Sequence, residues 1–269
     1  MENKSQVSHI AYKHISGVLV DIIERKKKEI AGKKQSISPL LGGGRGWVNA
    51  FYEKLLSAKT ISVIAEIKLA SPTHPNLGSK EEILQRAIAY EKADADAISF
   101  ITEKHYFKGD PLYISQLKQA VSLPILQKDF VIDESQIYEA KAIGSDALLL
   151  IVRYLDNETV QAFVSLCLKL AIEPVVEINN EEDLQKAITT NTRIIAVNAR
   201  NLEDFRIDVN KACALMKKVP DKYIKLGFSG IHSAKEVQQY KAAGAKGVLV
   251  GTALMKAGNI EMFIKRLSK

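Results

Sequence analysis

The sequence predicts an α/β protein, a (β/α)8 or TIM barrel with an N-terminal helical extension. After residue 60, short runs rich in β-branched residues alternate eight times with longer amphipathic stretches. This alternation is typical of a parallel sheet covered by helices. Eight such units in about 200 residues fit a closed barrel better than a doubly wound open sheet. No G-x-G-x-x-G motif follows the first run, which also speaks against a dinucleotide-binding fold.

The expected elements follow one another in regular order. Strands are predicted at 61–68, 96–101, 124–128, 146–152, 174–178, 193–198, 222–227 and 246–251. Helices are predicted at 80–93, 111–121, 134–143, 157–171, 181–190, 209–218, 233–243 and 259–268. Gly144 and Gly244 come just after helical stretches and before the next strand, where a glycine commonly ends a helix.

The first 60 residues precede the barrel, which we expect at 61–269 within one domain of residues 1–269. A basic helix is predicted at 22–34, and its run at 25–28 is typical of a solvated helix face. The glycine-rich run at 42–46 lacks the G-K-[ST] ending and the preceding strand of a P-loop. It therefore predicts a flexible connection to a further segment at 47–57.

The net charge of +7 is concentrated in the extension. Residues 1–60 hold 11 Lys and Arg against 5 Asp and Glu, whereas the remaining 209 residues hold 27 against 26. No zinc-finger or aromatic RNA-binding signature accompanies the basic stretch. We therefore expect no nucleic-acid partner.

Composition points to a cytoplasmic protein without a metal centre. The chain has 269 residues, 46% of them hydrophobic, and its longest apolar runs, such as 147–152, are too short to span a bilayer. Residues 1–9 are polar and lack an apolar signal core. Cys167 and Cys213 show no metal-ligand or redox spacing, and the five histidines form no metal-like cluster. We expect no cofactor, no metal and no membrane partner.

Charged side chains follow the predicted strands. In the first strand Ile64, Glu66 and Lys68 point to one face, because successive side chains alternate. Barrel enzymes place their chemistry at the carboxyl ends of the strands. Lys128, Glu177 and Asn198 occupy such ends as well. Lysines and carboxylates that converge on one cavity shift one another's pKa values, as an acid and a base at neutral pH require.

The last two units predict a phosphate site. Ser229-Gly230 and Gly251-Thr252 each follow a strand and precede a predicted helix. The loops after strands 7 and 8 are the usual phosphate site of this fold, where backbone N–H groups hold the anion. A phosphorylated sugar is therefore the expected class of substrate.

Several motifs closely resemble those of the indole-3-glycerol phosphate synthase family. They are A-E-I-K-x-A-S-P, L-P-I-L-x-K-D-F-x-I-D-x-x-Q-I-Y-E-A, D-A-L-L-L-I-V, V-x-E-I-N-x-E-x-D-L, I-I-A-V-N-x-R-N-L and S-G-I. The stretch V-L-V-D-I-I-E-R-K-K-K-E-I resembles that family's helix before the barrel. The resemblance implies a carboxy-lyase of tryptophan biosynthesis. Its substrate would be 1-(2-carboxyphenylamino)-1-deoxyribulose 5-phosphate, its product indole-3-glycerol phosphate, and it would use no metal or organic cofactor.

The resemblance also implies a role for each matching residue. Lys128 would be the general acid that protonates the ketone as the ring closes, and Glu177 the carboxylate for the proton transfers of dehydration. Lys68 would lie near the substrate carboxylate and can also act as an acid, oriented by Glu66. Asn198 would hydrogen-bond the substrate hydroxyls. The other matches imply substrate binding: Arg200 beside Asn198, Phe107 and Phe130 around the anthranilate ring, and Ser71, Ser229, Gly230, Gly251 and Thr252 at the phosphate.

The chain departs from the family pattern at two places. The family usually reads E-S-G-I where this chain has F-S-G-I, so Phe228 removes a carboxylate from the site. Reduced activity, a different aryl group and simple packing against the aryl ring all stay open. The family motif S-P-S-K-G is S-P-T-H-P-N-L-G here, and His74 is expected to be a solvated bystander.

Other functions are weighed against this one. Phosphoribosylanthranilate isomerase shares the fold, but that family uses a Cys after strand 1 and an Asp after strand 6, where this chain has Glu66, Lys68 and Asn198. A divergent paralogue acting on a modified anthranilate adduct stays open because of Phe228. A catalytically weak regulator that binds a phosphosugar also stays open, although the intact acid and base residues argue against it.

We expect a monomer.

Overall fold

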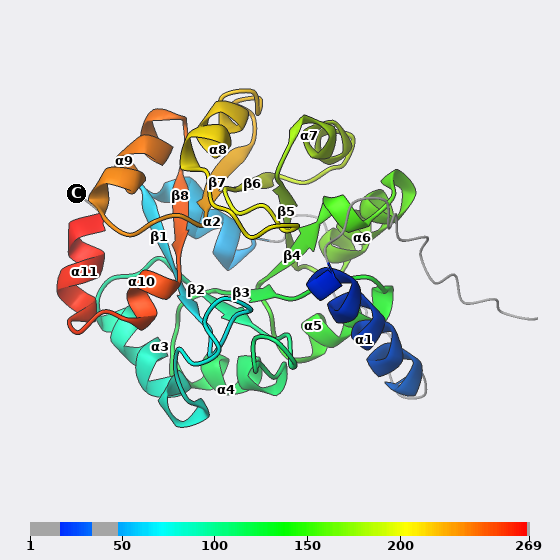
Figure 1. The fold of residues 1–269 in the computed structure, drawn as a ribbon, viewed down its shortest axis with the longest axis horizontal. Coiled ribbons are helices and arrows are strands. Elements are labelled where there is room, and N and C mark those ends of the chain that lie inside the picture. Colours follow the sequence, from blue (N-terminus) through cyan, green and yellow to red (C-terminus); the bar gives the residue numbers. More distant parts are fainter. Residues whose placement is uncertain (1–16, 34–47, 268–269) are drawn as a thin grey trace, which may run out of the picture.

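The computed structural model describes residues 17–33 and 48–267 and shows a closed parallel barrel (Figure 1). Each strand pairs in parallel with the next, and β8 pairs with β1, for example Val63 with Val248. The strands are β1 Ser62–Ile67, β2 Ala97–Ile101, β3 Ile125–Lys128, β4 Ala147–Ile151, β5 Glu173–Ile178, β6 Ile194–Asn198, β7 Ile224–Phe228 and β8 Gly247–Val250. The predicted fold class is therefore confirmed.

Helices form the layer around the barrel. They are α3 Ile83–Lys92, α4 Leu112–Ala120, α5 Glu134–Ala142, α6 Asn157–Lys169, α7 Glu181–Ile188, α8 Val209–Met216, α9 Ala234–Ala242, α10 Thr252–Met255 and α11 Ile260–Leu267, with 3-10 turns at Lys80–Glu82 and Val152–Tyr154. Asp133 and Ser233 begin α5 and α9 with reciprocal capping hydrogen bonds. Gly144 and Gly244 follow the same two helices with φ of +88° and +100°, which glycine adopts without steric cost. Their predicted role as helix ends is confirmed.

The strands bury both faces. Val63, Ala65 and Ile67 belong to the core between sheet and helices, whereas Ile64 belongs to the core inside the barrel. This explains why the strands read as near-continuous apolar runs. It also confirms that Glu66, two residues after Ile64, lies on the inward face.

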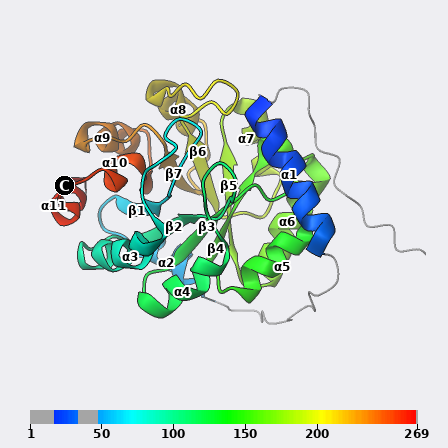
Figure 2. The same cartoon turned by 60° about the horizontal axis from the view of Figure 1, so that its bottom comes forward.

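The extension contributes two helices, α1 Gly17–Lys33 and α2 Ala50–Ser57. Phe51 and Leu55 of α2, together with Leu19 of α1, join the core inside the barrel. Figures 1 and 2 show α1 alongside α5 and α6. The predicted flexible run at 42–46 and the polar stretch at 1–9 lie outside the described residues.

The structure corrects several predicted boundaries. The basic helix begins at Gly17 rather than at residue 22, and within its basic run Lys26 is buried, at 5% exposure. The prediction of a solvated face is therefore wrong for that lysine. β7 extends to Phe228, and the short helix α10 was not predicted, because four residues carry no readable periodicity. No helix in the two described segments is long and apolar enough to cross a membrane.

Candidate active site

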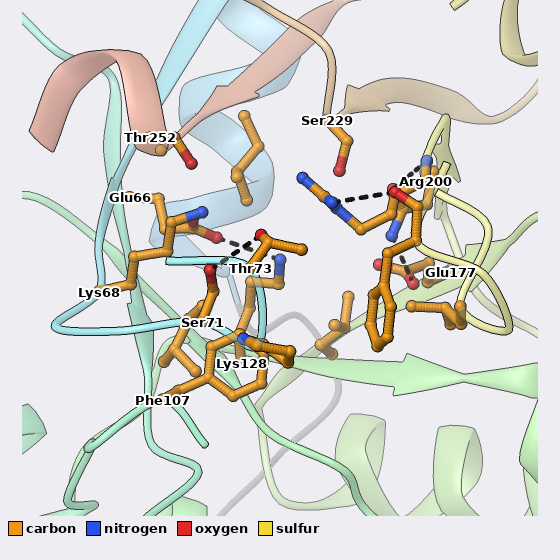
Figure 3. A pocket seen from close by; sticks show the side chains of 18 of the residues that line it. Glu66, Lys68, Ser71, Thr73, Phe107, Lys128, Glu177, Arg200, Ser229 and Thr252 are labelled. Carbon is orange, nitrogen blue, oxygen red and sulfur yellow. Dashed lines mark hydrogen bonds and ion pairs between the residues drawn. The ribbon is translucent and has the colours of Figure 1, made fainter. Parts of the chain in front are cut away.

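One cavity opens at the carboxyl ends of the strands (Figure 3). All thirteen residues that the sequence marked as catalytic or substrate-binding line it: Glu66, Lys68, Ser71, Phe107, Lys128, Phe130, Glu177, Asn198, Arg200, Ser229, Gly230, Gly251 and Thr252. The predicted convergence of these residues on one cavity is therefore observed.

Glu66 is the charged centre of the cavity floor. Its carboxylate is 2% exposed and lies 3.0 Å from Lys68 Nζ and 3.2 Å from Lys128 Nζ. Burial alone would raise the pKa of Glu66, but the attraction of Lys68 and Lys128 outweighs it and lowers the pKa to about 2. Glu66 is consequently ionised at neutral pH and holds both ammonium groups in place.

Gly251 makes room for this arrangement. A Cβ atom at residue 251 would lie 2.0 Å from Glu66 Oε2 and 3.1 Å from Lys68 Nζ. Any side chain at this position would therefore displace the carboxylate or the ammonium. The sequence predicted only phosphate binding for Gly251, because such a clearance becomes visible only when β1 and β8 are paired in space.

Glu177 and Asn198 form the opposite side of the site. Asn198 Nδ2 donates to Glu177 Oε1 at 3.0 Å, and Asn198 Oδ1 accepts the backbone N–H of Arg200. Glu177 Oε2 is buried without a hydrogen-bond partner in the described part of the chain. Burial raises the pKa of Glu177, and the nearby charge of Lys128 only partly opposes it. This carboxyl group is therefore suited to gain and lose a proton.

Aromatic rings form one wall of the cavity. The centroids of Phe107 and Phe130 lie 6.5 Å apart, with their planes inclined by 41°. The loop carrying Phe107 is held by Glu103, whose carboxylate accepts the backbone N–H groups of residues 105, 106 and 107. Leu19 and Ile22 of α1 line the cavity as well. The N-terminal helix thus completes the apolar wall, a contribution that the sequence did not reveal.

A buried ion pair fixes the strand end between Lys128 and Phe130. Lys26 of α1 lies 2.9 Å from Asp129 Oδ1, and both side chains are almost fully buried. Asp129 Oδ2 also accepts a hydrogen bond from Thr102 Oγ1 at 2.6 Å. The basic helix therefore anchors the segment that presents a lysine and a ring to the cavity.

Tight turns close the cavity after β7 and β8. Ser229 and Gly230 both have positive φ, +68° and +75°. A Cβ at residue 230 would lie 2.5 Å from Val209 Cγ2, so the turn requires glycine there. Across the cavity, Ser71 contacts Thr73 (Figure 3), and their Oγ and Oγ1 atoms are 3.3 Å apart.

Some polar residues at strand ends serve other purposes. Arg153, which follows β4, does not line the cavity and pairs instead with Glu203. His74 also lies outside the lining, with its Nδ1 3.1 Å from Thr73 Oγ1. Within residues 17–33 and 48–267, no group of three or more His, Cys, Asp or Glu side chains is placed to hold a metal ion.

Comparisons with known proteins identify relatives of the chain. The family model described as indole-3-glycerol phosphate synthase matches residues 19–267. A protein of that name from Caldanaerobacter subterraneus subsp. tengcongensis is 37% identical over 258 residues, covering 93% of this chain and 98% of the relative. The Bacillus cereus protein of the same name is 36% identical over 251 residues, covering 93% and 97%.

Solved structures show the same fold at lower identity. A 3-hexulose-6-phosphate synthase aligns with a TM-score of 0.63 and 18% identity, over 77% of this chain and 98% of its own. A thiamine phosphate pyrophosphorylase from Pyrococcus furiosus aligns with a TM-score of 0.55 and 14% identity, over 77% and 93%. Both similarities concern the barrel fold alone.

Proposed function

Because the chain belongs to the indole-3-glycerol phosphate synthase family, we propose a role for each group of cavity residues in that family's reaction. The chain has indole-3-glycerol phosphate synthase activity, a carboxy-lyase step of tryptophan biosynthesis. The proposed substrate, 1-(2-carboxyphenylamino)-1-deoxyribulose 5-phosphate, carries an aromatic ring, a carboxylate and a phosphate. The observation that supports the roles most directly is the placement of Lys68 and Lys128 on Glu66, with Glu177 in the same cavity.

Ring closure is the step proposed for Lys128. The ring carbon that bears the carboxylate bonds to the ketone carbon, and the ketone oxygen takes a proton from the Lys128 ammonium. Glu66 keeps that ammonium in position through their 3.2 Å ion pair. The carboxylate then leaves as carbon dioxide, and the electrons of the broken bond restore the aromatic ring. Lys68, the second ammonium on Glu66, is proposed to hold the substrate carboxylate before it leaves.

Dehydration is the step proposed for Glu177. The hydroxyl made by ring closure leaves as water after gaining a proton, and the neighbouring carbon beside the nitrogen loses one. A group with a carboxyl pKa raised by burial exchanges protons more readily near neutral pH, which is the condition of Glu177. Asn198 holds Glu177 Oε1 and is proposed to contact the substrate hydroxyls, with Arg200 beside it.

The remaining lining residues are proposed to bind the two ends of the substrate. Phe107 and Phe130 form an apolar wall suited to the anthranilate ring. The turns at Ser229-Gly230 and Gly251-Thr252, with Ser71, offer backbone N–H groups and hydroxyls to the phosphate. Lys68, Lys128 and Arg200 line the cavity and are proposed to attract the carboxylate and the phosphate of the substrate, whereas Glu66 balances part of the lysine charge.

The experiment that tests these roles is a steady-state assay of indole-3-glycerol phosphate formation. Lys128→Ala is expected to lower kcat by about 10²–10⁴-fold, the usual contribution of a general acid. Lys265→Ala, on the outer helix α11, is the matched control and should keep the parent kcat. A Lys128→Ala variant with a kcat within about threefold of the parent would remove Lys128 from the proposed mechanism.

Three further properties are part of the same proposal. We propose a monomer and a single domain of residues 1–269, whose described part forms one closed barrel. A cytoplasmic location is supported by two free cysteines, Cys167 and Cys213. Sedimentation of the purified protein tests the first property. A substrate series with substituted anthranilate rings tests the alternative of a modified adduct.

A further inference from the structure

Phe228 is the last residue of β7 and lies inside the barrel. Its side chain is 1% exposed, belongs to the core inside the barrel and does not line the cavity. Tyr240 fixes the backbone at this point, since its hydroxyl donates to the carbonyl oxygens of Phe228 and Ser229, each at 3.0 Å. The backbone that carries the ring is therefore held by Tyr240, and the ring itself is enclosed in the core inside the barrel.

The ammonium of Lys128 lies over this ring. Lys128 Nζ is 5.2 Å from the centroid of Phe228, within the range of about 6 Å in which a cation is attracted to an aromatic face. The same ammonium is 3.2 Å from Glu66 Oε1, and Glu66 is shared with Lys68. Lys128 is thus held between a ring face and a carboxylate that serves two lysines.

A ring and a carboxylate would hold this ammonium in different ways. A carboxylate at residue 228, as in the family motif E-S-G-I, would form an ion pair that is lost when the lysine gives up its proton. An aromatic face attracts the ammonium more weakly and accepts no proton. It therefore holds the donor in position without placing a further carboxylate beside it.

We propose that Phe228 is a positioning residue that holds the Lys128 ammonium over the cavity floor through its ring face. This inference rests on the proposed role of Lys128 as the general acid. It assigns a function to the residue at which the chain departs from its family. It also replaces the sequence-based alternative that Phe228 packs against the aryl group of the substrate, since the ring does not reach the cavity.

The test weakens the ring face while keeping its shape. Phe228 is replaced, by site-specific incorporation, with 4-fluoro-, 3,5-difluoro- and 3,4,5-trifluorophenylalanine, and Phe228→Leu removes the ring. Fluorine withdraws charge from the ring face, so kcat is expected to fall stepwise, by about tenfold at the end of the series. KM should stay within about twofold, because Phe228 does not touch the substrate.

The same replacements at Phe100 serve as the matched control. Phe100 is also fully buried on a strand, but it belongs to the core between sheet and helices and packs against Tyr113. Its series should leave kcat unchanged. A kcat that does not vary along the Phe228 series, or that falls equally along the Phe100 series, overturns the inference.

Lys128→Met, assayed in parallel, distinguishes a failure of the role proposed for Phe228 from a failure of the role proposed for Lys128. If this variant loses activity while the Phe228 series is flat, only the role of Phe228 fails. If Lys128→Met keeps its activity, the proposed general acid fails, and the role of Phe228 fails with it.

Discussion

Strand β5 carries one buried glutamate at each end, and the two are treated differently. Glu173, at the amino end, is 0% exposed and pairs with Arg193, whose guanidinium stacks 3.6 Å from the ring centroid of Tyr52 on α2. Glu177, at the carboxyl end, accepts one hydrogen bond from Asn198 and leaves Oε2 unpartnered within the described residues. Burial raises the pKa of both carboxyl groups, but only Glu173 has an adjacent cation bonded to it.

This difference between Glu173 and Glu177 indicates that the amino end of the barrel contributes to stability and the carboxyl end to activity. At the amino end the buried carboxylate has a dedicated cation, and the pair joins β5, β6 and the extension. At the carboxyl end Glu66 is shared between two lysines, and Glu177, which lines the cavity, has one carboxylate oxygen without a partner among the described residues. Sites kept ready for substrate in this way commonly reduce the stability of the fold. Substitutions at the two ends should therefore separate activity from stability.

The largest expected effect is on kcat at the carboxyl end. Glu177→Gln keeps the shape of the side chain but removes its proton exchange, so we expect kcat to fall by about 10²–10⁴-fold. The thermal midpoint should stay equal to that of the parent or rise, because a neutral amide replaces a buried carboxylate that burial disfavours. Steady-state kinetics and thermal unfolding of the same preparation measure both quantities.

The matched control is Glu173→Gln, the same change at the other end of β5. It should keep kcat within about twofold of the parent and lower the thermal midpoint, because Arg193 loses its partner. If both variants lose activity to the same extent, the two ends do not differ as described.

A smaller effect, on stability alone, is expected at the amino end. Arg193→Met leaves Glu173 buried without its cation, and the free energy of unfolding should fall by about 2 kcal/mol. The loss is smaller than for a fully buried pair, since the Arg193 side chain is 37% exposed and its charge is partly screened. Urea unfolding measures the change, and an accompanying loss of kcat would contradict the assignment of this end to stability.

The sequence predicted the barrel and the members of the site well, for a physical reason. Parallel strands in a barrel place all their carboxyl ends at one rim, so residues such as Glu66, Lys128 and Glu177 meet without any knowledge of their contacts. The alternation of side chains then indicates which of them face inward. The order of the strands and the alternation of side chains along each strand were sufficient to predict the fold and the residues of the site.

The remaining features depend on contacts between distant segments. Lys26 looks like part of a solvated run, and only the packing of α1 shows its pairing with Asp129, 103 residues away. The clearance at Gly251 depends on the neighbouring side chain of Glu66, and the contact of Phe228 with Lys128 crosses the barrel. No local pattern encodes such contacts, which explains why the sequence left the effect of Phe228 open.

The smallest expected effect is on the pH dependence of stability, and it again concerns Glu177 at the carboxyl end of β5. The folded-state pKa of Glu177 is raised above its usual 4.5, so the folded protein binds this proton more tightly than the unfolded chain does. Below pH 4.5 Glu177 is protonated in both the folded and the unfolded state. In this range its ionisation does not make the parent less stable than Glu177→Gln. As pH rises through the folded-state value, the parent loses stability and the variant does not.

The stability difference between Glu177→Gln and the parent should therefore grow with pH and level off on the alkaline side. Glu66 behaves in the opposite way, because its pKa is lowered to about 2, so its contribution is present above pH 4.5 and declines below it. It is common to both proteins and cancels in the difference. Urea unfolding of parent and variant from about pH 4 to pH 8 measures this curve. A difference that is constant across this range would mean that ionised Glu177 is fully compensated in the fold, like the paired carboxylate at the other end of the strand.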